Sequence, residues 1–419
     1  MEENLVVAVD LGSTYIKGII GSRTPDGEIS INAVHTQISS GIEHGMIVDI
    51  FALRNVFFPF MRELLNKAGL AKVIVKKFYV FYSYRKMKSV TVDVERVFEE
   101  RVIDEELLDE MLKESYKNPT SNSYINIYST PQAYVLNKTK PVLSPIGESA
   151  TSIKGRYTLV VGNSLGRDNM EKAFNVGNVN VAENAYSCDI PLDSMGEVVL
   201  REQERKKGTL LIDFGGETTT ISFYSHLSLR NFVVFEFGGR NVTNKLMEEF
   251  SILEADAEKL KIKCGVKPRQ GRIAVNGGKS VLDLEKVSDC INREIESQLS
   301  AISIFCQESN FFLKIQTVVI VGGGAKCVGI AEKLNGVFGK QVVGGFPICL
   351  NKDWSCVDTK ERLKYLDYSK MLAVLKNGNA PCVEPIKEQK SKGGKSIFSK
   401  MGEAIDRTSD FFFSFENSK

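Results

Sequence analysis

The stretch LVVAVDLGSTYIKGIIG, residues 5–21, decides the fold. Two runs rich in β-branched residues flank a turn marked by Gly12 and Ser13, which predicts a strand, a tight turn and a second strand. The same plan returns near the middle of the chain, where GTLLID (Gly208–Asp213) leads into FGGETT and then TISFYS (Thr220–Ser225). Because the two copies lie about 200 residues apart, they indicate an internal duplication and not a solenoid.

The two turns have the chemistry of an anion site. A Gly/Ser/Thr turn between strands directs successive backbone N–H groups into one concavity, and glycine lets a phosphate approach because no Cβ intervenes. Asp10 and Asp213 end the strands just before the turns, where we expect them to hold Mg²⁺ through its waters. A strand, not a helix, follows each turn, and G-x-x-x-x-G-K-[ST] is absent, so neither is a Walker-type P-loop.

A third glycine run follows the apolar segment Thr317–Val321 and precedes a predicted helix at Ile330–Phe338. Together the three glycine turns predict a two-lobed phosphate clamp. The region Arg85–Gly162 differs in character: it combines predicted strands at Ser89–Val94 and Tyr157–Val161 with an acidic helical segment. We therefore predict residues 1–84 and 163–206 as the first lobe, 85–162 as an inserted α+β subdomain, 207–380 as the second lobe with a helical subdomain at about 241–310, 381–395 as a flexible linker and 396–416 as an amphipathic helix.

Composition excludes several classes of protein. The chain has 419 residues, with 54 Lys+Arg against 52 Asp+Glu, and this near-neutral balance argues against a general nucleic-acid binder. We expect no secretory signal and no membrane-spanning segment, because no run approaches the roughly 18 apolar residues that a span requires. Eight cysteines without a C-x-x-C pair and only three histidines disfavour a zinc site and a His-based triad.

The C-terminal segment has an apolar stripe at helical spacing, typical of a helix that lies in a membrane interface. A helix that docks on its own protein body remains an alternative. Residues 386–400 carry five lysines against Glu388, whereas residues 1–385 are neutral, so positive charge adjoins the stripe where anionic head groups would meet it. The predicted membrane-contacting residues are Ile397, Phe398, Met401, Ile405, Phe411, Phe412 and Phe415.

These motifs resemble a known family. VDLGSTYIKG (Val9–Gly18), IDFGGETTT (Ile212–Thr220) and VVIVGGGAKCVGI (Val318–Ile330) are similar to the two phosphate motifs and the adenosine motif of the actin/sugar-kinase/DnaK-type ATPases. Within that superfamily, segments such as SSGIEHGMIVDI (Ser39–Ile50) and FGGRNVTNKL (Phe237–Leu246) resemble the bacterial FtsA family in the right order. The resemblance covers nearly the whole chain and implies an α/β, two-lobed actin-like ATPase fold with a duplicated core.

By matching position, the resemblance implies ATP and Mg²⁺ as ligands and assigns the residues that hold them. Glu258 and Lys261, which lie on one helix face at i and i+3, resemble the pair that holds ribose and adenine. Arg293 resembles an arginine that docks the tail of the tubulin-like protein FtsZ. The remaining residues resemble the first phosphate loop (Asp10, Gly12, Ser13, Thr14, Lys17), the second (Asp213, Gly215, Gly216, Thr218) and the adenosine loop (Gly322, Gly323, Gly324).

The second phosphate motif departs from the family pattern at two positions. Glu217 stands where the family has a third glycine, and Thr220 where it has an aspartate. A carboxylate about 5 Å from a phosphate charge is repelled by on the order of 3 kcal/mol at an effective ε near 20. Either Glu217 points away, or it contacts the metal's waters, or nucleotide binds weakly. We expect ATP binding with slow turnover or none, and assign no catalytic base; Glu183 is the one candidate considered.

The family resemblance implies a peripheral protein on the cytoplasmic face of the cell membrane at the division site. It would anchor FtsZ filaments, assemble with itself into an actin-like filament and bind other divisome proteins. Two alternatives stay open: a small-molecule kinase of the same superfold, and a PilM-like adaptor of a pilus or secretion assembly. A DnaK-type chaperone is disfavoured because no substrate-binding domain follows the ATPase body.

Overall fold

The computed structural model describes residues 4–117, 123–350, 352 and 358–386. It divides the chain into one compact unit, Met1–Glu384, and a second unit, Pro385–Lys419. The predicted amphipathic helix at 396–416, with every predicted membrane-contacting residue, lies outside the described residues, as does most of the predicted linker. Among the helices of the described part, none is both long and apolar enough to cross a bilayer.

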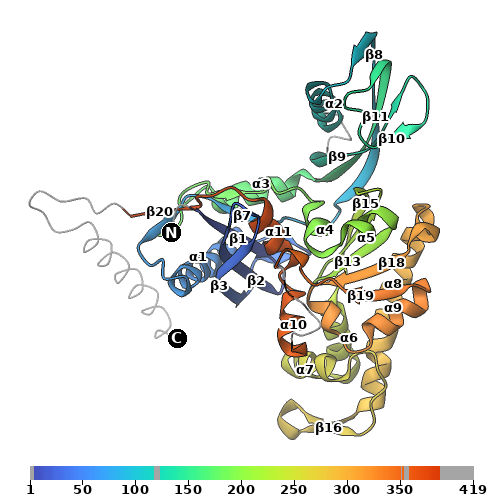
Figure 1. Cartoon of the computed structure of the whole chain (residues 1–419). Coiled ribbons are helices and arrows are strands. Elements are labelled where there is room, and N and C mark those ends of the chain that lie inside the picture. Colours follow the sequence, from blue (N-terminus) through green and yellow to red (C-terminus); the bar gives the residue numbers. More distant parts are fainter. Residues whose placement is uncertain (1–3, 118–122, 351, 353–357, 387–419) are drawn as a thin grey trace, which may run out of the picture. The chain divides into compact units, whose positions relative to one another are not determined.

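The first unit contains two five-stranded arrays built on one plan (Figure 1). In each, the first three strands pair antiparallel in sequence, the fourth pairs parallel with the first, and the fifth pairs parallel with the fourth. This common order confirms the predicted duplication and the α/β class. The first array consists of β1 (Leu5–Leu11), β2 (Tyr15–Arg23), β3 (Ile29–Ile38), β7 (Phe78–Val80) and β12 (Tyr186–Ser187), and the second of β13 (Thr209–Phe214), β14 (Thr219–Ser225), β15 (Ser228–Phe235), β18 (Thr317–Val321) and β19 (Gln341–Gly344).

α-Helices and further strands make up much of the rest of the described part of the chain. The helices are α1 (Ile50–Lys67), α2 (Glu105–Lys117), α3 (Ser164–Phe174), α4 (Ser194–Val199), α5 (Glu202–Lys207), α6 (Gly239–Phe250), α7 (Glu254–Cys264), α8 (Leu284–Glu308), α9 (Ile330–Phe338), α10 (Thr359–Tyr365) and α11 (Ser369–Asn377). The other strands are β4 (Ile42–Glu43), β5 (Met46–Ile47), β6 (Val73–Val75), β8 (Lys88–Val102), β9 (Tyr124–Leu136), β10 (Pro141–Val142), β11 (Ser149–Asn163), β16 (Arg272–Val275), β17 (Ser280–Asp283) and β20 (Val383–Pro385). The strand and helix predicted on either side of the third glycine run are confirmed at their predicted bounds.

Helices α1 and α11 pack on opposite faces of the first-lobe sheet. A Cβ on Gly18 would lie 2.7 Å from Leu64 Cδ2 of α1, and a Cβ on Gly21 would lie 2.9 Å from Leu375 Cδ1 of α11. Residues three apart on a strand face opposite sides of its sheet. The predicted domain boundaries stay a prediction. These boundaries assign α11 to the second lobe, whereas the apolar side chains of α11 pack in the core of the first lobe.

The second-lobe sheet is buried on both faces. Leu210 and Ile212 of β13 pack into a core with α6, α8 and α9, whereas Leu211 between them faces the core that continues into the first lobe. A strand that is covered on both faces has a continuous apolar sequence, which is why GTLLID predicted a strand. The apolar stripe of α8, with Ile291 and Ile295 at its centre, lies in the first of these cores.

The inserted subdomain has its own small core beneath α2. Its strands β8 and β11 pair antiparallel along most of their 15 residues, and β8 joins the second-lobe sheet where Lys88 pairs with Val233 of β15. The predicted strands were much too short. In the outer parts of these strands, charged residues alternate with apolar residues that stay exposed, as at Val97. Because these parts are not buried, the sequence there has no continuous apolar run that would predict a strand.

A β-hairpin, β16–β17, interrupts the predicted helical subdomain and was missed. Its turn is Asn276, Gly277 and Gly278, all with positive φ. Asn-Gly between short alternating runs is a strong local hairpin signal, so the sequence contained the information.

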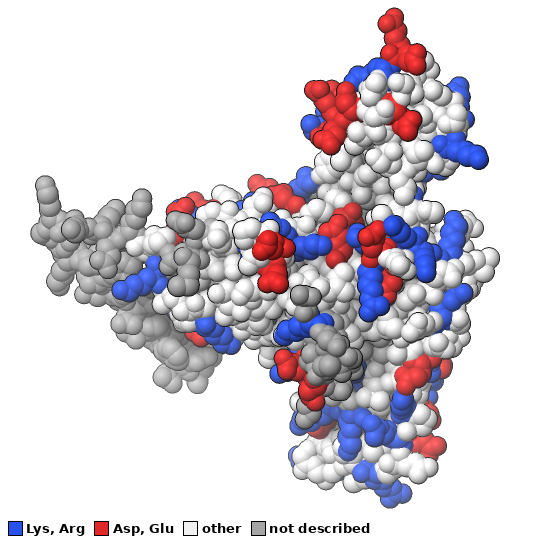
Figure 2. Space-filling view, viewed as in Figure 1, with Lys and Arg blue, Asp and Glu red and all other residues white. Residues whose placement is uncertain are grey.

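The surface carries both signs of charge in close alternation. Figure 2 shows Lys and Arg interspersed with Asp and Glu over the described part of the face in view. This distribution agrees with the formal net charge of +2.

Phe57 of α1 tests the first-lobe core. Its ring lies 4.8 Å from that of Phe174 and 5.1 Å from that of Phe78, centroid to centroid, and it is fully buried. We expect Phe57→Ala to lower the free energy of unfolding by about 3–5 kcal/mol, measured by urea denaturation. Phe51→Ala, at a position 75% exposed on the same helix, should change it by less than about 0.5 kcal/mol. Equal effects would show that α1 is not packed as described.

Candidate functional site

One cavity of about 490 Å³ brings the three glycine turns together. It is lined by residues of both lobes, so it lies between the duplicated sheets at the ends of their first strands. All of the predicted nucleotide-contacting residues line it: Asp10, Gly12, Ser13, Thr14, Lys17, Asp213, Gly215, Gly216, Thr218, Glu258, Lys261, Gly322, Gly323 and Gly324. Their role as nucleotide ligands stays a prediction.

The two phosphate turns touch each other across this cavity. A Cβ on Gly216 would lie 2.1 Å from Thr14 Oγ1, which is far inside van der Waals contact, so a larger residue would require Thr14 to move. Gly215 N–H donates to the Thr218 carbonyl at 2.8 Å and closes the second turn. The turn is therefore positioned by its own backbone and by the side chain of Thr14 from the other lobe.

The hairpin β4–β5 binds both turns through its tip. His44 and Gly45 have φ of 47° and 74°, the left-handed pair that a tight two-residue hairpin requires. His44 N–H donates to Glu217 Oε2 at 2.8 Å, and Gly45 N–H donates to Ser13 Oγ at 2.9 Å. In addition, His44 Nδ1 lies 3.0 Å from the Glu217 carbonyl oxygen. Of the three alternatives for Glu217, this favours the first: its carboxylate is bound to the opposite lobe.

Asp213 is paired with a lysine that the sequence did not single out. Lys370 Nζ, at the start of α11, lies 2.8 Å from Asp213 Oδ2, and the two side chains are 17% and 8% exposed. Burial by itself lowers the pKa of Lys370, but Asp213 and Asp10 outweigh it and raise that pKa above its ordinary value. Since the Asp213 carboxylate already has a cationic partner, a Mg²⁺ shared by Asp10 and Asp213 does not fit this arrangement.

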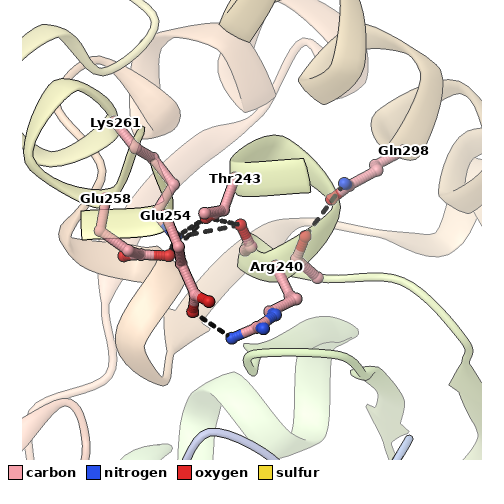
Figure 3. Close-up of polar contacts among 8 residues, drawn as sticks. Arg240, Thr243, Glu254, Glu258, Lys261 and Gln298 are labelled. Atoms are coloured by element: carbon pink, nitrogen blue, oxygen red, sulfur yellow. Dashed lines mark hydrogen bonds and ion pairs between the residues drawn. The ribbon is translucent and has the colours of Figure 1, made fainter. Parts of the chain in front are cut away.

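Glu258 and Lys261 lie on one face of α7, as predicted, and point toward α6 (Figure 3). Lys261 Nζ donates to Glu258 Oε1 at 2.7 Å, to Thr243 Oγ1 at 2.8 Å and to the Gly239 carbonyl at 3.0 Å. The Thr243 hydroxyl donates to Glu258 in turn. The pair thus ties α7 to the first turn of α6 while it lines the cavity.

The charged groups around the cavity balance. Five acidic and five basic side chains line it, and two of these, Lys326 and Asp367, form an ion pair next to the third glycine turn. Lys17, which pairs opposite Asp10 across the first hairpin, has no ion pair within the described part of the chain. It is the cavity cation most open to an added anion.

Two other candidate residues, Arg293 and Glu183, and the departure at Thr220 lie outside the residues that line the cavity. Arg293 lies on the exposed face of α8, and its NH2 group is 2.8 and 2.7 Å from the two carboxylate oxygens of Glu249 on α6. Glu183 is exposed and is not among the residues around the cavity, so the structure does not bring this candidate to the site. Thr220 is buried, and its hydroxyl has no hydrogen-bond partner in the described part of the chain.

The family model and the curated relatives that match this chain are both described as FtsA. A family model described as "Cell division protein FtsA" matches residues 210–364. FtsA of Neisseria meningitidis serogroup B is 22% identical, with 97% of this chain and 99% of the relative covered. FtsA of Escherichia coli K12 is also 22% identical, with 83% and 85% covered. FtsA of Buchnera aphidicola subsp. Schizaphis graminum is 26% identical, but only 61% of its length is spanned.

Among solved structures, the chain is similar to one described as "PilM-PilN type IV pilus biogenesis complex". The TM-score is 0.61, the identity is 15%, and 90% of this chain and 99% of the other are covered. At this identity the likeness shows the fold alone: a mixed α/β, actin-like fold.

Contact between the two turns can be tested with Gly216→Ala. The new Cβ would overlap Thr14 Oγ1, so we expect about 1–3 kcal/mol of destabilisation, read from thermal unfolding. Adding Thr14→Ala removes the overlapping atom and should recover most of the loss. Gly336→Ala on α9, where nothing lies within 4 Å, is the matched control and should be neutral or slightly stabilising. Additive effects of the two turn substitutions would contradict the contact.

Proposed function

We propose that this member of the FtsA family of actin-like proteins is a cell-division protein. It would bind ATP and link FtsZ filaments to the inner face of the cytoplasmic membrane. The observation that carries this proposal is the convergence of three separate motifs on one cavity. The phosphates would lie against the two hairpin turns, with Lys17 as their cation. The ribose and base would lie between α7 and the third glycine turn.

Slow turnover is part of the proposal. The two residues that depart from the family motif are both occupied elsewhere: Glu217 is hydrogen-bonded to the first lobe, and Thr220 is buried. We assign no residue of the described cavity as a base that activates water. Bound ATP would then act mainly as a ligand that stabilises the actin-like body. Self-assembly of that body would multiply the membrane affinity of single tails through avidity.

The base-and-ribose assignment is tested by Lys261→Ala. Because Lys261 organises three acceptors beside the cavity, we expect its loss to raise the Kd for ATP by about tenfold, as expected for charge-assisted hydrogen bonds. Isothermal titration calorimetry would measure it. Lys263→Ala, an exposed lysine on the same helix, should leave the Kd unchanged. An unaltered Kd in Lys261→Ala would remove this residue from the site.

The membrane proposal rests on the apolar stripe of residues 396–415 and on the lysines before it. Burial of a large apolar side chain contributes about 1.5–3 kcal/mol. Phe412→Glu with Phe415→Glu should therefore abolish co-sedimentation with anionic liposomes, whereas Ser414→Glu on the polar side should retain it. Co-sedimentation that survives the double substitution would favour a helix that docks on its own protein.

The FtsZ proposal concerns α8. In a pull-down with an FtsZ C-terminal peptide, Arg293→Ala should reduce binding by about fivefold or more, the loss expected for an interface residue worth more than 1 kcal/mol. Arg269→Ala, an exposed arginine outside α8, is the control. Absence of peptide binding by the unmodified chain would revive the pilus-adaptor or kinase alternatives; substrate-dependent consumption of ATP would then identify a kinase.

A further inference from the structure

The two motif aspartates occupy equivalent places in the duplicated hairpins but face different partners. Asp10 pairs across its hairpin with Lys17, whereas Asp213 pairs across its hairpin with Thr220. The second hairpin therefore lacks a lysine of its own. Lys370 supplies that charge from α11, at 2.8 Å from Asp213 Oδ2.

Asp213 is 6% exposed, and each of its carboxylate oxygens has a close neighbour. Oδ2 contacts the Lys370 ammonium, and Oδ1 lies against Gly322, where a Cβ would approach to 2.4 Å. Helix α11 cannot shift freely, because the residues that follow Lys370, from Met371 to Leu375, are all buried in the first-lobe core. The packing of α11 in the first-lobe core therefore fixes the backbone of Lys370 beside Asp213.

Mg²⁺ needs oxygen ligands in near-octahedral geometry and retains several waters. At Asp213 one oxygen lies beside the Gly322 backbone and the other is paired with an ammonium. A divalent ion brought to the same carboxylate would also be repelled by Lys370. Geometry and charge therefore both disfavour a metal at this aspartate.

We propose that Lys370 is the resident cation of this cavity: it takes the place of a divalent metal at Asp213, and with Lys17 it faces the phosphates of a bound nucleotide. Nucleotide binding is then independent of Mg²⁺. This second part rests on the proposed ATP binding, whereas the exclusion of the metal does not.

Metal exclusion is tested with Mn²⁺ alone, titrated into the nucleotide-free full chain and followed by electron paramagnetic resonance. Lys370→Ala should bind Mn²⁺ at least about tenfold more tightly than the unmodified chain, because it uncovers a carboxylate and removes a repelling charge. Adding Asp213→Asn should abolish that gain. Lys376→Ala, at the far end of the same helix, should not differ from the unmodified chain. Equal Mn²⁺ affinity with and without Lys370, tight or weak, overturns the proposal.

Metal-independent binding is tested by ATP titration in EDTA and in Mg²⁺. For the unmodified chain, the Kd for ATP in EDTA and the Kd for ATP in Mg²⁺ should agree within about threefold. Lys370→Ala should lose about tenfold or more in EDTA and regain it in Mg²⁺. A tenfold requirement for Mg²⁺ in the unmodified chain overturns the inference but leaves ATP binding intact. If ATP binds in neither buffer, the proposed function is overturned. The Mn²⁺ titration then decides the role of Lys370.

Discussion

The second hairpin turn is held by the first lobe at three points, and the geometry of the cavity depends on them. Thr14 packs against Gly216, His44 binds Glu217, and Lys370 pairs with Asp213. The three contacts differ in kind: a steric fit, a backbone hydrogen bond to a carboxylate, and a buried ion pair. Removal of one partner of a buried pair leaves an uncompensated charge, so separation of the lobes at this turn is costly.

Much of the fold was predictable because its signals are local. A buried strand that ends in aspartate and is followed by a glycine turn is readable within about ten residues, and two copies suffice to indicate duplication. The inserted subdomain was recognised by its changed composition, but β8 and β11 were underestimated because their outer residues are not buried. The cavity followed from the motifs, since equivalent turns of two related lobes converge.

The contacts that distinguish this cavity were not predictable. Lys370 lies 157 positions after Asp213 in the numbering and sits at the start of a largely apolar helix, where a single lysine gives no sign of its partner. Glu217 was recognised as a departure, yet its partner is the backbone N–H of His44, which no side-chain pattern reveals. Tertiary pairing of this kind depends on which elements pack together, and only the structure supplies that.

The three interlobe contacts also bear on the choice between functions. A kinase of this superfold must open to admit an acceptor and close again to exclude water from the reaction. Here the second glycine turn is bound to the opposite lobe, and the aspartate before it is paired with a lysine anchored in that lobe's core. Such a cleft favours a stably closed body over repeated opening. A stably closed actin-like body is what the proposed assembling scaffold requires, and it is consistent with the proposed slow turnover.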